Sequence, residues 1–199
     1  MSEDLIDSDI RVAKTLPSKF YTEEKRFRKL LKAFKTSWQF VGLSNQFTSD
    51  ITPIDHVSNI LNEPMIRVQN ADTAQLLSNV CTHRGMLICS ESKETRRLQC
   101  PYHGRTFDLN GQFRNMPEFS QVENFPTAAD HLVHYPLAEW KGLLFNTMSA
   151  ENFDSFIEAV DARVGWLEIE SFTHDITRHR TYTIESNWAL YVDNYLEGF

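Results

Sequence analysis

The sequence predicts a mainly β fold with flanking helices. Between residues 39 and 146, short runs of β-favouring residues are separated by turn signals such as Asn110-Gly111 and Lys141-Gly142. Before and after this region, apolar residues recur at the three- and four-residue spacing of an amphipathic helix. These patterns indicate a small, mostly antiparallel β region with helices on either side of it along the chain.

The first helix is predicted from Thr22 to Trp38, with Thr22 as its cap, because its apolar residues share one face: Phe27, Leu30, Leu31, Phe34 and Trp38. Strands are expected in the short runs that follow, at residues 39–43, 65–68, 75–79, 97–100, 105–109, 132–137 and 143–146. A helix with Phe153, Phe156, Ile157, Val160 and Val164 on one face comes next, then a strand at 176–184 and a helix at 187–196. The sequence pattern changes from strand-like runs to helical spacing near Ser149. We therefore expect a helical segment (1–43), a β domain (44–148) and the beginning of a second domain (149–199).

Composition excludes several classes of function. The chain carries 20 Lys and Arg against 27 Asp and Glu, and no basic stripe is present, so a nucleic acid is not an expected partner. No stretch approaches about 18 apolar residues and the acidic N-terminus has no apolar core, so we expect a cytoplasmic protein without a membrane partner. The three cysteines are an odd count that favours metal or redox chemistry over a disulfide framework.

Two short segments each supply one cysteine and one histidine: Cys81-Thr-His83 and, sixteen residues further on, Cys100-Pro-Tyr-His103. A [2Fe–2S] cluster with mixed ligands places two cysteines on one iron and two histidines on the other. A structural zinc site can use the same four residues, although common zinc modules pair Cys with Cys and His with His. The mixed pairs therefore favour the cluster, with zinc as the alternative.

The residues around these pairs complete the patterns C-x-H-R-G at 81–85 and C-P-Y-H-G at 100–104. In this respect the sequence resembles the Rieske domain, whose cluster-binding signature has this form. The resemblance implies a [2Fe–2S] cluster at one end of a three-sheet antiparallel β domain, with its two histidine ligands near the surface. Cys89 has no partner in the second loop, so we expect a buried small residue there.

The resemblance extends to residues 37–42 (Ser-Trp-Gln-Phe-Val-Gly) and to 187–197, which is similar to the N-W-x-x-x-x-[DE]-N-[YF] helix of Rieske non-haem iron oxygenase alpha subunits. These subunits, which include ring-hydroxylating dioxygenases and choline monooxygenase, continue from the Rieske domain into an α+β catalytic domain. In that family a carboxylate on this helix links a cluster histidine of one subunit to an iron-ligand histidine of the next. Glu197 occupies the matching position, and its Tyr-Leu-Glu context favours the branch that acts on quaternary amines over aromatic substrates. A solvated residue at a helix end is the alternative for Glu197.

The resemblance implies an enzyme that passes electrons from a flavin or ferredoxin-type reductase to a mononuclear iron, which hydroxylates a small organic substrate with O2. It also implies a homotrimer in the full-length protein. The first histidine of that iron would lie beyond Phe199, so mononuclear Fe(II) is expected only in a longer chain and the enzyme is incomplete here. We expect the other histidines to be surface or packing residues: His56, His131, His134, His174 and His179.

A stand-alone Rieske ferredoxin is the alternative function. Such an electron carrier would need only the β domain. The helix at 22–38 and about fifty residues after Ser149 would then have no role, which favours the oxygenase.

Overall fold

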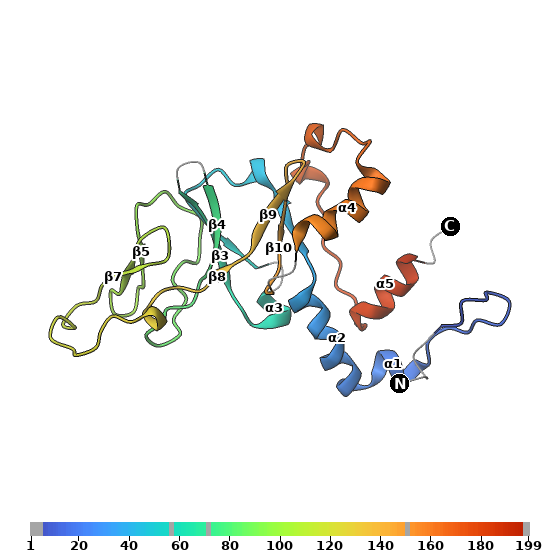
Figure 1. Cartoon of the computed structure of the whole chain (residues 1–199), viewed down its shortest axis with the longest axis horizontal. Helices are drawn as coiled ribbons and strands as arrows, with labels where there is room; N and C mark the ends of the chain where they lie inside the picture. The colour runs from blue at the N-terminus through green and yellow to red at the C-terminus, as the bar shows by residue number, and fades with distance from the viewer. Residues whose placement is uncertain (1–5, 56–57, 71–72, 150–151, 197–199) are drawn as a thin grey trace. The chain divides into compact units, whose positions relative to one another are not determined.

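The computed structural model describes residues 6–55, 58–70, 73–149 and 152–196. The chain divides into two compact units, of which the larger is Phe34–His174 and the smaller combines Met1–Ala33 with Asp175–Phe199. Five α-helices are formed in the described residues (Figure 1): α1 (Ser18–Thr22), α2 (Glu24–Thr36), α3 (Ser58–Leu61), α4 (Phe153–Val164) and α5 (Trp188–Leu196).

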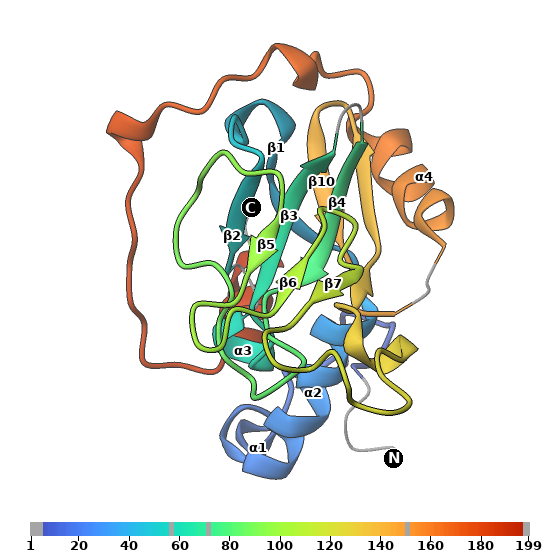
Figure 2. The same cartoon turned by 90° about the vertical axis from the view of Figure 1, so that its left-hand side faces the viewer.

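The larger unit contains three antiparallel sheets in its described part, which confirms the predicted fold class (Figure 2). The first has the order β1 (Gln39–Leu43), β10 (Leu143–Asn146), β9 (Leu137–Trp140). The second has the order β2 (Ile51–Ile54), β3 (Met65–Asn70), β4 (Thr73–Ser78), β8 (His134–Tyr135). The third has the order β5 (Leu98–Gln99), β6 (Thr106–Phe107), β7 (Phe113–Asn115).

Two strands, β2 and β7, were not expected from the sequence, β9 was expected only at its first residue, and β5 and β6 are shorter than predicted. Strand β2 contains Pro53, which breaks the pattern of a strand in the sequence. It is tolerated because β2 lies at an edge of its sheet, where the missing N–H need not enter a ladder. Strand β9 follows β8 after Pro136, so the single run expected at 132–137 is divided between two sheets.

The four-stranded sheet is buried on both faces. One face joins the β5–β7 sheet in the main core, where Ile66, Leu77 and Phe107 are fully buried. The other face carries Met65 and Leu76, which pack with residues of the first sheet such as Val41. Burial on both sides explains why the first four residues of β3 are all buried, Arg67 among them, instead of every second one.

Gly111, in the turn between β6 and β7, is packed directly against this core. Its φ is +74°, and a methyl group there would lie 3.2 Å from Cβ of Leu132 and 3.3 Å from both Cδ atoms of Leu77. We expect Gly111→Ala to lower the free energy of unfolding by about 2–4 kcal/mol, through left-handed backbone strain and overpacking. Urea denaturation would measure it.

Gly142 provides the matched control for this substitution. Its φ is +76°, but the nearest atom to an added methyl group is the Ser44 hydroxyl oxygen at 3.9 Å. Gly142→Ala should therefore cost only the backbone strain, about 1 kcal/mol. Equal losses in the two variants would show that crowding by Leu77 and Leu132 contributes nothing.

Helix α2 begins later and ends earlier than predicted. Thr22 does not cap it, because Thr22 is the last residue of α1 and its hydroxyl donates to the Ser18 carbonyl at 3.1 Å. Trp38 lies beyond the end of α2, where it is buried and its ring meets Phe153 edge-on at 4.8 Å. The apolar spacing in the sequence is therefore longer than the helix, because Trp38 packs into the core from the extended segment after α2.

The predicted helix after Ser149 is confirmed as α4. Asn152 caps it by accepting a hydrogen bond from the Asp154 N–H at 2.8 Å. Its Phe153 and Phe156 rings pack against Phe145 of β10, at centroid distances of 5.7 and 5.8 Å. The aromatic face read from the sequence is thus the face that covers the first sheet.

In the smaller unit the strand predicted at 176–184 is wrong. All of these residues are described, and they form only the 3-10 turn Ile176–Arg178 followed by irregular chain. Ile176 and Ile184 are exposed, so the alternation has no buried face to support it. Elsewhere the 3-10 turns are Ser44–Gln46, Ala128–Asp130 and Ile169–Ser171.

Helix α5 confirms the last predicted helix. Asn187 caps it by accepting from the Ala189 N–H at 3.0 Å, and its amide donates to the Tyr21 carbonyl at 3.1 Å. The Tyr21 hydroxyl donates to Asp193 at 2.5 Å. The motif helix is therefore fastened to the N-terminal helical segment within this unit. None of the described helices is long and apolar enough to cross a membrane.

Candidate metal centre

The first Cys/His pair lies in a tight turn after β4. The Cys81 N–H donates to the Met86 carbonyl at 2.8 Å, and the Gly85 N–H donates to the Cys81 carbonyl at 2.9 Å. Gly85 has a φ of +69°, which glycine adopts without a steric penalty. An antiparallel bridge between Val80 and Leu87 closes the turn. Main-chain hydrogen bonds hold this loop. The conformation of the loop therefore does not depend on the side chains of the ligand candidates Cys81 and His83.

The second pair lies in a turn of the same design, between β5 and β6. The Cys100 N–H donates to the Arg105 carbonyl at 2.8 Å, and the Gly104 N–H donates to the Cys100 carbonyl at 3.1 Å. Gly104 has a φ of +72°, and the pair Gln99–Thr106 closes the turn. The two loops therefore share one hydrogen-bond pattern, counted from each cysteine, although the histidine comes two residues later in one and three in the other.

Across the two loops, like side chains lie side by side. The thiols of Cys81 and Cys100 are within hydrogen-bonding reach of each other, and the rings of His83 and His103 are 4.9 Å apart between centroids. Both thiols are about 2% exposed, whereas His83 is partly exposed and His103 is exposed. The arrangement of two inner sulfurs and two outer imidazoles fits the two-plus-two ligation of a mixed [2Fe–2S] cluster.

A single ion would need a different arrangement. Over the ranges that the structure describes, no group of three or more His, Cys, Asp or Glu residues is placed to hold one metal ion. Tetrahedral zinc requires four ligands around one centre, whereas each iron of the cluster requires two from the protein. The donor set and its pairing therefore fit the cluster.

The surroundings of the ligand candidates shift their pKa values. Burial raises the pKa of the Cys81 thiol. The backbone N–H of His83, which donates to the sulfur, lowers this pKa in part, and the adjacent Cys100 raises it further. Iron would deprotonate the thiol on binding. Burial, then the neighbouring His103 and two arginines, lowers the pKa of His83. This shift favours the neutral imidazole, which is the form that binds metals.

Cys89 is separate from the candidate site, as expected. It is buried, and its sulfur lies 2.9 Å from the Glu91 carbonyl, to which it donates. The Asn79 side chain bonds both the N–H and the carbonyl of Cys89, at 2.9 and 2.7 Å. Cys89 is thus a small buried residue whose backbone is held in place by the Asn79 side chain.

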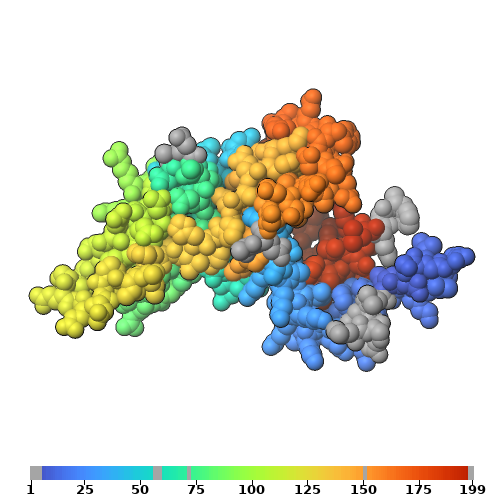
Figure 3. All heavy atoms as spheres, in the orientation of Figure 1, coloured from blue at the N-terminus to red at the C-terminus, as the bar shows by residue number. Residues whose placement is uncertain are grey.

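Two aromatic residues beside the histidines were missed by sequence reasoning. The Tyr102 ring stacks on the His103 ring with centroids 3.7 Å apart, and Phe119 meets His83 edge-on at 5.9 Å. The segment around Phe119, yellow in the space-filling view, projects at the end of the larger unit (Figure 3). The motif itself contains Tyr102, but nothing in the sequence places Phe119 near His83.

Four of the other histidines singled out from the sequence lie in the described residues, and two of these, His174 and His179, are exposed. His131 accepts the Phe113 N–H on its Nδ1 at 2.9 Å, and His134 contacts the Asn110 carbonyl through Nε2 at 2.9 Å. Both therefore make structural hydrogen bonds in the β domain. Glu197 and His56 lie outside the described residues.

Residues 37–126 match the protein-family model described as "Rieske [2Fe-2S] domain", which spans β1 to β7 and both loops. These residues form a Rieske domain. Its cofactor is a [2Fe–2S] cluster, in agreement with the fit of the two loops. The Rieske domain therefore coincides with the part of the chain in which thiols and imidazoles are paired.

The similarity extends beyond the Rieske domain. The carnitine monooxygenase oxygenase subunit of Escherichia coli K12 is 31% identical over 193 residues, which cover 93% of this chain and 50% of the relative. Choline monooxygenase of Arabidopsis thaliana is 28% identical, with 94% and 47% covered. The crystal structure of the apo form of a quaternary ammonium Rieske monooxygenase is 26% identical, with a TM-score of 0.78 over 99% of this chain and 56% of that one.

The chain is thus homologous to the carnitine and choline monooxygenases and to a ring-hydroxylating enzyme, the chlorobenzene dioxygenase subunit alpha. It spans about half the length of these relatives. The match includes the helical segments on both sides of the Rieske domain, since it covers more than nine-tenths of the chain.

Proposed function

We propose that this chain is the electron-transferring part of a Rieske non-haem iron oxygenase, and that Cys81, His83, Cys100 and His103 hold its cluster. The pairing of buried thiols and outer imidazoles across two matching loops carries this proposal. A cluster bound there takes up and releases single electrons. The protein would hold the sulfurs away from water and present the histidines at the surface, where electrons enter and leave.

For the oxygenase we propose a quaternary amine as the substrate class. The carnitine and choline monooxygenases support this choice, as does the Tyr-Leu-Glu context of Glu197. In this proposal residues 149–199 begin the catalytic domain, Glu197 is the bridging carboxylate, and a longer chain supplies the mononuclear iron ligands. The attachment of α5 to Tyr21 supports a shared role for the N-terminal segment and the motif helix.

The proposal also includes partners. Single electrons must come from a donor, and we propose a flavin or ferredoxin-type reductase in the cytoplasm. We propose a homotrimer for the full-length protein. A stand-alone ferredoxin is the weaker reading, because the similarity to oxygenase subunits continues on both sides of the Rieske domain.

Metal and sulfide analysis together with EPR of the reduced protein tests the cluster. We expect two irons and two acid-labile sulfides per chain and the rhombic signal of a mixed-ligand [2Fe–2S] centre. The matched control is the air-oxidised sample, which should be EPR-silent. Zinc in place of iron, without a signal, would overturn the assignment.

The oxygenase requires a separate test on a chain that continues past Phe199. We expect one further iron per chain and, with a reductase, O2 uptake that depends on carnitine or choline. An aromatic substrate such as chlorobenzene is the comparison. O2 uptake with the aromatic alone would contradict the substrate class, and an absence of further iron would contradict the oxygenase.

A further inference from the structure

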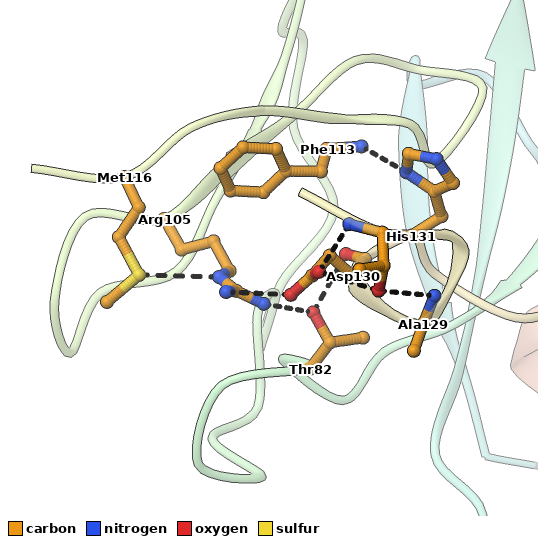
Figure 4. A network of polar contacts seen from close by, with 8 residues as sticks. Thr82, Arg105, Phe113, Met116, Ala129, Asp130 and His131 are labelled. Atoms are coloured by element: carbon orange, nitrogen blue, oxygen red, sulfur yellow. Dashed lines mark hydrogen bonds and ion pairs between the residues drawn. The ribbon is translucent and has the colours of Figure 1, made fainter. Parts of the chain in front are cut away.

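Arg105 follows directly on the second cluster-binding loop and is buried, with about 3% of its side chain exposed. Its guanidinium donates through one terminal nitrogen to the Thr82 hydroxyl at 2.6 Å and through the other to the Asp130 carboxylate at 3.1 Å. The Nε lies 3.5 Å from the Met116 sulfur. Figure 4 shows the three groups converging on this one side chain.

Thr82 connects this arginine to the first loop, because it stands between the ligand candidates Cys81 and His83. Its hydroxyl accepts from Arg105 and donates to the Asp130 carbonyl at 2.9 Å. Arg105 therefore ties the two cluster-binding loops together through side chains, in addition to the backbone turns within each loop.

Asp130 is itself held in place. One carboxylate oxygen bonds Arg105, while the other accepts from the Thr127 N–H at 2.8 Å and from its hydroxyl at 3.1 Å. The bond from the Thr127 N–H is one half of the capping box of the 3-10 turn Ala128–Asp130. The carboxylate thus stands at a fixed distance from the guanidinium.

The guanidinium lies among apolar groups. The Phe113 and Phe125 rings are 5.1 and 5.4 Å from its central carbon, which places it in cation–π range of both. Dissolved ions screen a buried charge of this kind only weakly.

From this geometry we propose that Arg105 and Asp130 form a buried charge pair that sets the reduction potential of the cluster, with Arg105 raising it and Asp130 lowering it. The inference rests on the proposed function, since it requires the cluster on these loops. Reduction adds one negative charge to the site, so a nearby positive charge favours the reduced form and a negative charge opposes it. Arg105 acts here as a positioning residue, joined to the ligands through Thr82.

The experiment is a redox titration of the cluster-loaded chain, followed by EPR. Arg105→Met should lower the potential and Asp130→Asn should raise it, each by about a tenfold change in the equilibrium constant for reduction, or about 59 mV for one electron. Thr82→Val, which leaves both charges in place, should move the potential less than either. Arg105→Lys should recover most of the loss seen with methionine.

Arg114→Met is the matched control. Arg114, in β7, also pairs with an aspartate, Asp108 at 2.6 Å, but its side chain is 65% exposed. Removal of this solvent-screened charge should leave the potential unchanged. Loss of structure alone would shift the Arg105 and Asp130 variants in the same direction, so opposite signs identify the charge effect.

The outcomes separate the two proposals. A wild-type chain without a [2Fe–2S] signal would contradict the proposed function. A normal wild-type signal with a potential that Asp130→Asn leaves unchanged or lowers would overturn the charge pair alone. Should Arg105→Met fail to retain the cluster, the direction of the Asp130→Asn shift relative to Arg114→Met still decides the question.

Discussion

Cys100→Ala is expected to abolish iron binding, and with it the visible absorption and the EPR signal of the reduced protein. In the proposed ligand set one of the two irons is held by the thiolates of Cys81 and Cys100, and an alanine cannot replace the sulfur. The loss should be complete, because Cys81 alone would leave that iron with one protein ligand. Iron and sulfide analysis of the purified variant measures it directly.

Cys89→Ala is the control for this loss. Cys89 is as deeply buried as Cys100, and its sulfur is engaged with the Glu91 carbonyl. We expect a full cluster in this variant and a loss of about 1 kcal/mol in the free energy of unfolding. If Cys89→Ala loses the cluster and Cys100→Ala keeps it, the ligand set is wrong.

His83→Cys is expected to retain the cluster and lower its reduction potential by about 120 mV or more. A thiolate adds one negative charge where the neutral imidazole adds none. Two such exchanges separate the mixed cluster, at about −150 mV or above, from the all-cysteine cluster at about −400 mV, so one exchange accounts for about half of that difference. Redox titration followed by EPR measures the shift.

His134→Cys provides the same residue change away from the candidate site. His134 belongs to β8, where its ring contacts the Asn110 carbonyl at 2.9 Å. The potential should stay at the wild-type value in this variant. An unchanged potential in His83→Cys, with the cluster intact, would argue against direct ligation by His83.

The two candidate cluster loops were predictable because the residues that define them lie close together in the sequence. Each loop needs a cysteine, a histidine and a glycine with positive φ within five residues, and all three are visible in the sequence. The β domain was also predictable, since its strands are separated by strong turn signals. The fold class and the Rieske domain followed from these two features.

The remaining features depend on contacts between distant segments. The strand at Ile51–Ile54 was hidden by Pro53, whose place at a sheet edge is known only once the sheet is formed. The alternating run at 176–184 lacked a buried face. The Thr82–Arg105–Asp130 contacts join residues up to 48 positions apart, which no local spacing reveals.

The two loops separate the residues that build their turns from the residues that form their outer surface. The turns depend on main-chain hydrogen bonds and on a glycine, whereas the outward residues Met86, Leu87 and Tyr102 are at least 38% exposed. Substitutions at these outward positions would change the exposed surface of the loops and leave the backbone turns intact. In the proposed function, the surface that an electron donor meets can therefore be altered by substitution while the residues that hold the cluster stay the same.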